Sequence, residues 1–336
     1  MRPIKKMRIV ISSALAAWIA ASPSMVFSQS KPLQISNLSP LASLRAIPSQ
    51  RSVETERGPS WIASATLSNH FTVEDRAGES LFLDGQTDAL TLSLRYGLPK
   101  QWDVEVSVPW RHHSGGFTDN LISSWHSVFG LPDGNRSSYP TDVLLYQLSQ
   151  PAHDRRLPSS VSGLGDINVA VSRPLMRIDE GQLGISAGIK TASGQSSDWL
   201  GSGTTDFYAL LRFSGQQLGG GPLWWHGQAG GTRAGESDLL GPQQRRSLWF
   251  AGLATEWRFA PRWSALLQYD THSALLDGEL DALSEPAGML SLALRWRPTS
   301  QWVIEVGFSE DVIVESAPDI TFLFNASYVS RRSEAY

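Results

Sequence analysis

The chain has 336 residues, of which 18% are charged, and a formal net charge of −4. This acidic balance excludes the basic surface of a nucleic-acid-binding protein, so no nucleic acid is expected as a partner. The sequence contains no cysteine, which excludes both disulfides and a lipid anchor on an N-terminal cysteine.

Residues 1–28 have the pattern of a secretory signal peptide. Four basic residues lie within the first eight positions, and residues 9–21 form an apolar run that is short for a membrane span. We expect cleavage near Ser28, and a retained anchor helix is the alternative. Removal of the four basic residues leaves 24 Lys and Arg against 32 Asp and Glu, a net charge of about −8.

Residues 29–60 are rich in Pro and Ser and lack the alternation of a strand. We interpret them as a periplasmic arm. The arm either folds into the barrel described next as a plug or stays a disordered tail, and the sequence does not separate the two.

From residue 61 onward, segments of about ten residues alternate apolar and polar side chains. In one of them, Trp102, Val104 and Val106 share one face, and Asp103 and Glu105 share the other. A period of two indicates a strand. Aromatic residues at the ends of apolar faces, with charges on the opposite faces, are typical of a transmembrane β-barrel that is apolar toward lipid. A soluble β-sandwich does not explain those charged faces.

The pattern predicts twelve strands in a single antiparallel barrel over residues 61–329. They cover residues 61–73, 88–97, 101–111, 163–174, 182–191, 204–213, 223–231, 247–259, 262–272, 289–297, 301–309 and 320–328. Short connections alternate with longer ones, as periplasmic turns alternate with extracellular loops. Both termini are therefore expected in the periplasm of a Gram-negative cell. A strand at residues 143–148 would invert this alternation, so we assign that stretch to extramembrane structure.

Residues 112–162 form one long extracellular loop in this prediction. Within it, Leu121, Ile122, Trp125, Val128 and Phe129 recur at helical spacing and predict a short helix. An apolar helix in an extracellular loop must bury its face, so we expect it on or in the mouth of the barrel. Residues 330–336 are a C-terminal tail.

Several motifs resemble an uncharacterised family of proteobacterial outer-membrane β-barrel proteins. They are SGGF at 114–117, GLPDGNR at 130–136, GLGD at 163–166, WLGSGTTD at 199–206 and NLSPL at 37–41. The resemblance covers nearly all of the exported chain. It implies an outer-membrane barrel and no particular activity.

The charged faces of the strands predict the residues that line the barrel interior. These residues are Arg95, Asp103, Glu105, Arg111, Lys190, Arg212, Glu256, Arg258, Asp270, Arg295, Arg297 and Glu305. Twelve strands lie between small barrels, which side chains fill, and large ones, which leave a channel. We therefore expect a narrow or plugged conduit for small solutes. A purely structural outer-membrane protein is an alternative. The histidines show no metal-ligand spacing, and we expect no cofactor.

His112 and Ser114 give the one enzymatic alternative, a lipid-directed hydrolase. A His-x-Ser pair at the end of a strand looks like the arrangement in outer-membrane phospholipase A and lipid A deacylases, in which the histidine activates the serine. Those enzymes carry Asn after the serine, whereas this chain has Gly115. Pairing Tyr96 with Trp102 would set Gln86 opposite His112 and Asp84 opposite Ser114. We weigh an enzyme below a conduit.

An outer-membrane barrel has a defined set of partners. We expect contact with outer-membrane lipid and lipopolysaccharide, insertion by the barrel-assembly machinery, and an unidentified small solute.

Overall fold

The computed structural model describes residues 30–55, 58–119, 122, 124, 136–179, 181–216, 221–313 and 317–330. The predicted signal peptide, most of the predicted loop helix and the last six residues lie outside this part. Of the helix, one turn is described, in which the backbone N–H of Ile122 donates to the carbonyl of Thr118 at 2.9 Å.

The fold is all-β, as the alternation predicts. The strands are β1 (Ser60–Arg76), β2 (Glu79–Leu98), β3 (Trp102–Ser114), β4 (Leu145–Gln150), β5 (His153–Leu157), β6 (Val161–Leu164), β7 (Asn168–Ile178), β8 (Gly181–Lys190), β9 (Asp206–Gly215), β10 (Leu223–Arg233), β11 (Ser247–Ala260), β12 (Trp263–His272), β13 (Ala287–Trp296), β14 (Trp302–Asp311) and β15 (Ile320–Val329). Short helices connect some of them: η1 (Ala42–Leu44), η2 (Pro99–Gln101), η3 (Arg136–Ser138), η4 (Ser196–Asp198) and α2 (Asp281–Ser284). No helix of the described residues is long and apolar enough to cross a membrane.

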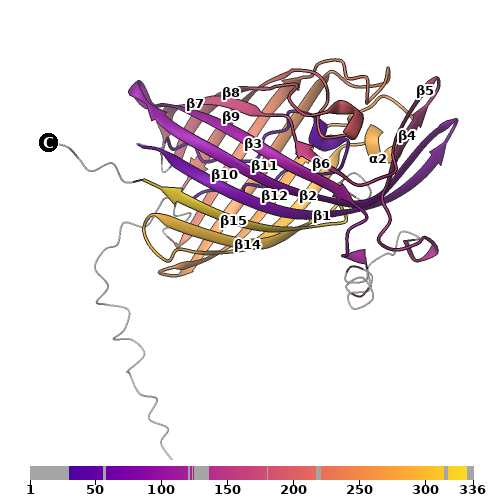
Figure 1. Ribbon diagram of the computed structural model, residues 1–336. Coiled ribbons are helices and arrows are strands. Elements are labelled where there is room, and N and C mark those ends of the chain that lie inside the picture. The colour runs from indigo at the N-terminus through magenta and orange to yellow at the C-terminus, as the bar shows by residue number, and fades with distance from the viewer. Residues whose placement is uncertain are drawn as a thin grey trace, which may run out of the picture.

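The sheet closes on itself as a twelve-stranded antiparallel barrel, which confirms the predicted fold (Figure 1). Strands β1, β2, β3 and β7 to β15 form the ring. The last strand returns to the first, in a ladder that runs from Ser60 opposite Val329 to Asn69 opposite Ile320. Closure leaves no free sheet edge, and this lets strands cross hydrocarbon.

The two ends of the barrel differ. At one end, short connections join β2 to β3, β7 to β8, β9 to β10, β11 to β12 and β13 to β14, and we call this the short-turn end. The other is the loop end. There β1 and β2 continue as a hairpin beyond the ring, and β4 pairs with β2, β5 with β4, and β6 with β3 (Figure 1). The last described residues of β15 lie at the short-turn end with the start of β1.

Residues 74–87 were predicted as a loop, but the structure places most of them in strands. The chain turns only at Ala77 and Gly78, which have φ of 47° and 87°, and β1 and β2 pair from Arg76 and Glu79 onward. From Leu81 to Thr87 nearly every side chain is buried, whichever face of the strand it leaves, whereas Asp75 to Gly78 at the tip are exposed. The alternation of apolar and polar residues that marks the lipid-facing strands is therefore missing here.

Residues 163–174 were predicted as one strand, whereas the structure interrupts it between β6 and β7. Asp166 lies between the two strands, and its carboxylate accepts the N–H groups of Gly194 and Ser202 at 2.9 Å and the Lys190 ammonium at 2.6 Å. The ladder between β3 and this part of the chain shifts register there.

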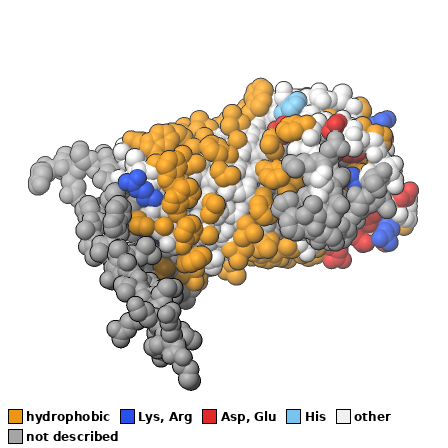
Figure 2. All heavy atoms as spheres, turned by 90° about the horizontal axis from the view of Figure 1, so that it is seen from below, with side chains coloured by type: hydrophobic (Ala, Val, Ile, Leu, Met, Phe, Trp, Pro, Cys, Tyr) orange, Lys and Arg blue, Asp and Glu red, His pale blue; other side chains and the backbone are white. Residues whose placement is uncertain are grey.

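The outward face is apolar around the middle of the barrel, with charged side chains toward the ends of the visible face (Figure 2). Leu90 and Leu253 are among the most exposed of these side chains. At the short-turn end, Trp61 lies against Trp302 and Tyr328, with ring centroids 5.3 and 6.2 Å away. Amphipathic rings at such a rim suit the headgroup region of a membrane.

The two ends predict different access from outside the cell. Lys100 lies in a short turn and Asp277 in a connection at the loop end, and both side chains are exposed. Because the chain has no cysteine, Lys100→Cys and Asp277→Cys each introduce a single thiol. In intact cells, a membrane-impermeant maleimide should label the second variant and not the first. Both should react after lysis, and labelling of Lys100→Cys in intact cells would overturn the orientation.

Candidate functional site

The N-terminal segment, residues 30–55, occupies the interior of the barrel. Its ascending part is bonded to β12, where the Leu33 N–H donates to the Gln268 side chain at 2.8 Å and the Asn37 amide contacts the His272 ring at 3.0 Å. Gln268 and His272 lie on the inward face of that strand, with His272 nearer the loop end. The segment therefore runs up the inside of the barrel wall.

The segment then turns and comes back along β9, three strands away from β12 in the ring. The Ala46 N–H donates to the Asp206 carboxylate at 3.0 Å, and the Val53 N–H donates to the Ser214 hydroxyl at 2.9 Å. Asp206 begins β9 at the loop end and Ser214 lies near its short-turn end. The segment thus crosses the barrel twice before it enters β1.

The turn of the segment lies in the largest apolar cluster of the molecule. Leu41 precedes η1 and Leu44 is its last residue, and both are fully buried there. Loops and strands of the loop end supply the remainder of the cluster, which includes Leu81, Leu83, Tyr146, Leu148, Trp199, Leu239, Leu240, Leu275, Leu276, Leu280 and Leu283. These side chains cover the mouth of the barrel over the segment.

Most of the predicted interior charges are buried and paired near the short-turn end. Around Glu256, the guanidinium groups of Arg295 and Arg297 bind its carboxylate, and Arg295 also binds Glu305. Arg258 lies 3.8 Å from Glu256. The segment contributes as well, because the Arg295 guanidinium donates to the carbonyl of Lys31 at 2.5 Å.

A second charged group surrounds Arg51 of the segment. Its guanidinium binds Asp103 and lies 3.8 Å from Glu105, and Arg95 binds Glu105. Arg51 and Arg212 both donate to the Ser172 hydroxyl at 3.2 Å. Arg51 of the segment thus lies among four of the predicted interior residues, which are Arg95, Asp103, Glu105 and Arg212.

The third charged group lies nearer the loop end. Lys190 binds Asp166 and lies 3.8 Å from Asp206, which is also 3.8 Å from Arg45. Burial lowers the pKa of the Arg45 guanidinium, and the Asp206 carboxylate opposes that shift. Asp270 has no cationic partner among the described residues, and accepts from the Gln50 and Gln268 amides at 2.8 Å.

Four further interior charges were not predicted from the alternation of the strands: Arg45, Arg51, Asp166 and Asp206. The two aspartates stand in the GLGD and TTD motifs that carry the family resemblance, and their shared contact with Lys190 was not apparent from either motif. The two arginines lie in a segment without strand alternation, so no face could be assigned to them.

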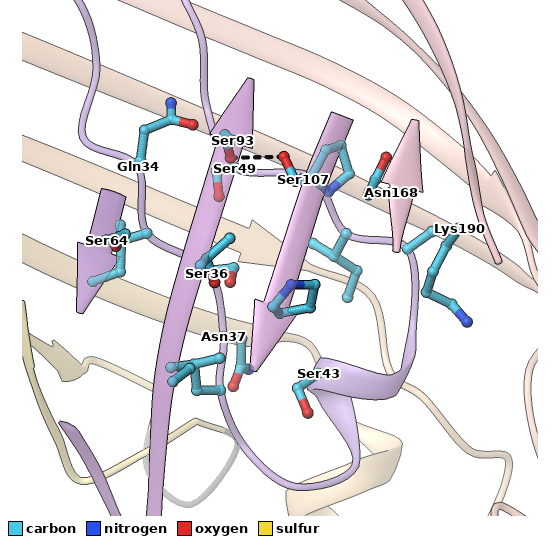
Figure 3. Close-up of a pocket in the computed structure, with 18 of the residues that line it drawn as sticks. Gln34, Ser36, Asn37, Ser43, Ser49, Ser64, Ser93, Ser107, Asn168 and Lys190 are labelled. Carbon is cyan, nitrogen blue, oxygen red and sulfur yellow. Dashed lines mark hydrogen bonds between the residues drawn. The ribbon is translucent and has the colours of Figure 1, made fainter. Parts of the chain in front are cut away.

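Between the segment and the wall of β1, β2, β3 and β7 lies a cavity of about 160 Å³ (Figure 3). Its middle is lined by hydroxyl and amide groups, and Ser93 and Ser107 share a hydrogen bond of 2.7 Å across β2 and β3. Arg111 lies in its lining toward the loop end and Arg212 toward the short-turn end. This polar space can hold water or a small polar solute.

His112 and Ser114 do not form the contact that a hydrolase requires. The β2–β3 ladder is shifted by two residues from our prediction and sets Asp88 opposite His112 and Gln86 opposite Ser114. The Ser114 hydroxyl accepts the Gly116 N–H at 3.2 Å. Within the described residues no hydrogen bond joins it to His112, so the geometry that would activate the serine is missing.

The charged groups hold no arrangement suited to a metal ion. No cluster of three or more His, Asp or Glu side chains with that geometry occurs in the part of the chain that the structure describes.

Comparison with known proteins identifies a family and a fold. The family model described as "Protein of unknown function (DUF3187)" matches residues 9–329. No curated protein sequence matches the chain. An outer membrane channel from Pseudomonas putida F1 has a similar structure, with a TM-score of 0.52, 12% identity, and 85% of this chain and 98% of that chain covered. The NanC porin gives a TM-score of 0.47 at 8% identity and covers 82% of this chain and 100% of its own.

The buried ion pairs predict a large stability difference between two acidic residues. Glu256→Gln leaves Arg295 with Glu305 and removes the carboxylate that Arg297 binds. We expect it to lower the free energy of unfolding by about 3–5 kcal/mol. Asp277→Asn removes the partner of Arg245 in an exposed pair and should cost less than about 1 kcal/mol. Urea unfolding in lipid vesicles, followed by tryptophan fluorescence, measures both. Equal losses would contradict the role given to Glu256.

Proposed function

The chain belongs to the DUF3187 family of unknown function, and we propose that it is a narrow outer-membrane conduit for small solutes, closed at rest by its N-terminal segment. One observation carries the proposal. The ring closes entirely through strands from residue 60 onward, whereas the segment that fills it contains no strand. The segment can therefore leave the interior without breaking a ladder of the barrel.

The nature of the contacts supports a removable plug. Besides the apolar contacts of Leu41 and Leu44, the segment is held by side-chain hydrogen bonds, such as Val53 to Ser214, and by ion pairs such as Arg51 with Asp103. Water and mobile ions replace such contacts when an interior becomes hydrated, at a net cost of about 0.5–1.5 kcal/mol for a neutral hydrogen bond. Displacement would leave an interior lined by hydroxyls, amides and charges.

The polar interior also favours a conduit over a purely structural barrel. A barrel that only holds its place in the membrane has no need of buried charges, each of which is costly to desolvate. The structural alternative predicts no conductance whether or not the segment is held in place. No contact in the described residues favours the lipid-directed hydrolase.

We further infer the setting of this conduit. The short-turn end faces the periplasm with both termini, the first 28 residues are the cleaved export signal, and the barrel-assembly machinery inserts the chain among lipid and lipopolysaccharide. The aromatic rim and the apolar outer band support this arrangement.

A disulfide between the segment and the wall should hold the conduit closed. A Cβ built on Gly184 lies 3.5 Å from the Cβ of Val53, which suits a disulfide. In planar bilayers, the Val53→Cys/Gly184→Cys variant should show little conductance when oxidised. Reduction should restore the wild-type level.

Each single cysteine variant is the control, because it carries the same local change without the cross-link and should not respond to the reductant. Equal conductance of the oxidised and reduced double variant would show that the segment does not close the barrel. An absence of conductance in every form would favour the structural alternative.

Weakening one anchor of the segment should have the opposite effect. Arg51→Gln/Asp103→Asn replaces both partners of a buried ion pair with neutral groups of similar size, so that no charge is left unpaired. We expect the ratio of open to closed channels to rise roughly tenfold. This corresponds to a loss of about 1.4 kcal/mol in the free energy that favours the closed state. Single-channel recording measures the open fraction, and an unchanged or lower fraction would contradict this anchoring role.

A further inference from the structure

From two arginines of the cavity we infer that the conduit prefers small anions with carboxylate or phosphate groups; this inference rests on the proposed function and names its solute class. Arg111 and Arg212 both line the cavity and are more than nine-tenths buried. Neither forms an ion pair with a carboxylate in the part of the chain that the structure describes. The Nε atom of each is buried without a hydrogen-bond partner.

The hydrogen-bond partners of these two arginines are all neutral groups. The Arg111 guanidinium donates to the carbonyls of Ser43 at 2.9 Å and Leu200 at 3.2 Å, and both acceptors are neutral. The Arg212 guanidinium donates to the Ser172 hydroxyl, which also accepts from Arg51. Two guanidinium groups that converge on one hydroxyl repel each other, and a bound anion would relieve that repulsion.

The cavity is lined by an excess of positive charge, whereas the chain as a whole has a net negative charge. Five basic side chains line it, Arg45, Arg51, Arg111, Lys190 and Arg212, against the two carboxylates of Glu105 and Asp166. Three of the five cations have carboxylates within 4 Å, so the excess positive charge resides on Arg111 and Arg212. Because the chain as a whole has a net charge of −4, this local excess of positive charge does not follow from the overall composition. Buried charges at membrane depth mark solute pathways.

The positions of the two arginines suit the passage of an anion. Arg111 lies six residues beyond Glu105 on β3, a distance of about 20 Å along the strand, and Arg212 lies in the charged group around Glu105 and Arg51. Hydroxyl and amide groups of residues such as Ser64, Ser107 and Asn168 line the stretch between them (Figure 3). Guanidinium groups bind carboxylates and phosphates in bidentate geometry, and the hydroxyls supply neutral hydrogen bonds along the way.

Ion selectivity tests the inference directly. In planar bilayers with a KCl gradient, the reversal potential of the wild type should indicate preference for chloride over potassium. Arg111→Gln/Arg212→Gln should lower the chloride-to-potassium permeability ratio by roughly threefold or more, because it removes the positive charge from the path. Arg111→Lys/Arg212→Lys keeps the charge and should stay anion-selective. Arg177→Gln, an exposed position on β7 outside the cavity, should match the wild type.

A binding measurement separates failure of this inference from failure of the conduit. Inorganic phosphate should raise the melting temperature of the wild type in detergent, relative to chloride at equal ionic strength, and should not raise that of Arg111→Gln/Arg212→Gln. Without ligand, the Gln variant loses hydrogen bonds to Ser43, Leu200 and Ser172 but no ion pair, so the phosphate effect is measured for each protein as the shift from its own melting temperature in chloride.

The possible results distinguish failure of the anion preference from failure of the conduit. Conductance with cation selectivity, or with a ratio that the Gln variant leaves unchanged, overturns the anion preference and leaves the conduit standing. Absence of conductance overturns the conduit, and the anion site then stands only if phosphate stabilises the wild type and not the Gln variant. Equal phosphate effects on the two proteins overturn the site.

Discussion

Closure of the sheet through β1 and β15 is the constraint on which the rest of the structure depends. In hydrocarbon every backbone N–H and C=O of a strand must find a partner on another strand. The antiparallel ladder from Ser60–Val329 to Asn69–Ile320 provides the last row of these bonds. Closure turns one face of every strand inward, and a ring of twelve is wide enough that side chains alone do not fill it. The interior of the barrel must therefore be occupied by further polypeptide, and the N-terminal segment occupies it.

The charges of the segment and the charges of the barrel wall neutralise each other. The inward faces carry carboxylates such as Asp103 and Asp206, and the segment brings Arg51 and Arg45 to them. Polar groups inside a barrel of low dielectric are costly unless they are paired, so each arginine both fixes the segment and neutralises the wall. The apolar residues of the segment are placed by the same logic, because Leu41 and Leu44 pack where the loops provide other apolar side chains.

This arrangement explains how a barrel can be stable while holding a polar path. The ladder and the outer apolar band secure the ring independently of its contents. The segment depends instead on individually modest hydrogen bonds, on buried ion pairs such as Arg51 with Asp103, and on the apolar contacts of its turn. In the conduit proposed above the segment is the moving element, and moving elements usually come from the part of a protein with the lowest local stability. The cavity beside the segment, with Arg111 and Arg212 in its lining, lies at the boundary between the two.

The sequence by itself determined the strands and their faces, because a period of two depends only on the backbone geometry of each strand: Trp102, Val104 and Val106 were assigned outward, and Asp103 and Glu105 inward, without knowledge of any neighbour. The alternation of side chains does not specify which residues of neighbouring strands lie opposite one another. The turn at Pro99–Gln101, with φ of 59° at Lys100 and 62° at Gln101, sets Leu98 opposite Trp102 and moved the β2–β3 ladder by two residues from the predicted one. The tertiary structure alone decided the partners of the buried charges, the path of residues 30–55 and the extension of β1 and β2 beyond the ring. The physical reason is that each depends on contacts between residues far apart in the chain, such as Arg45 with Asp206, which local periodicity does not record.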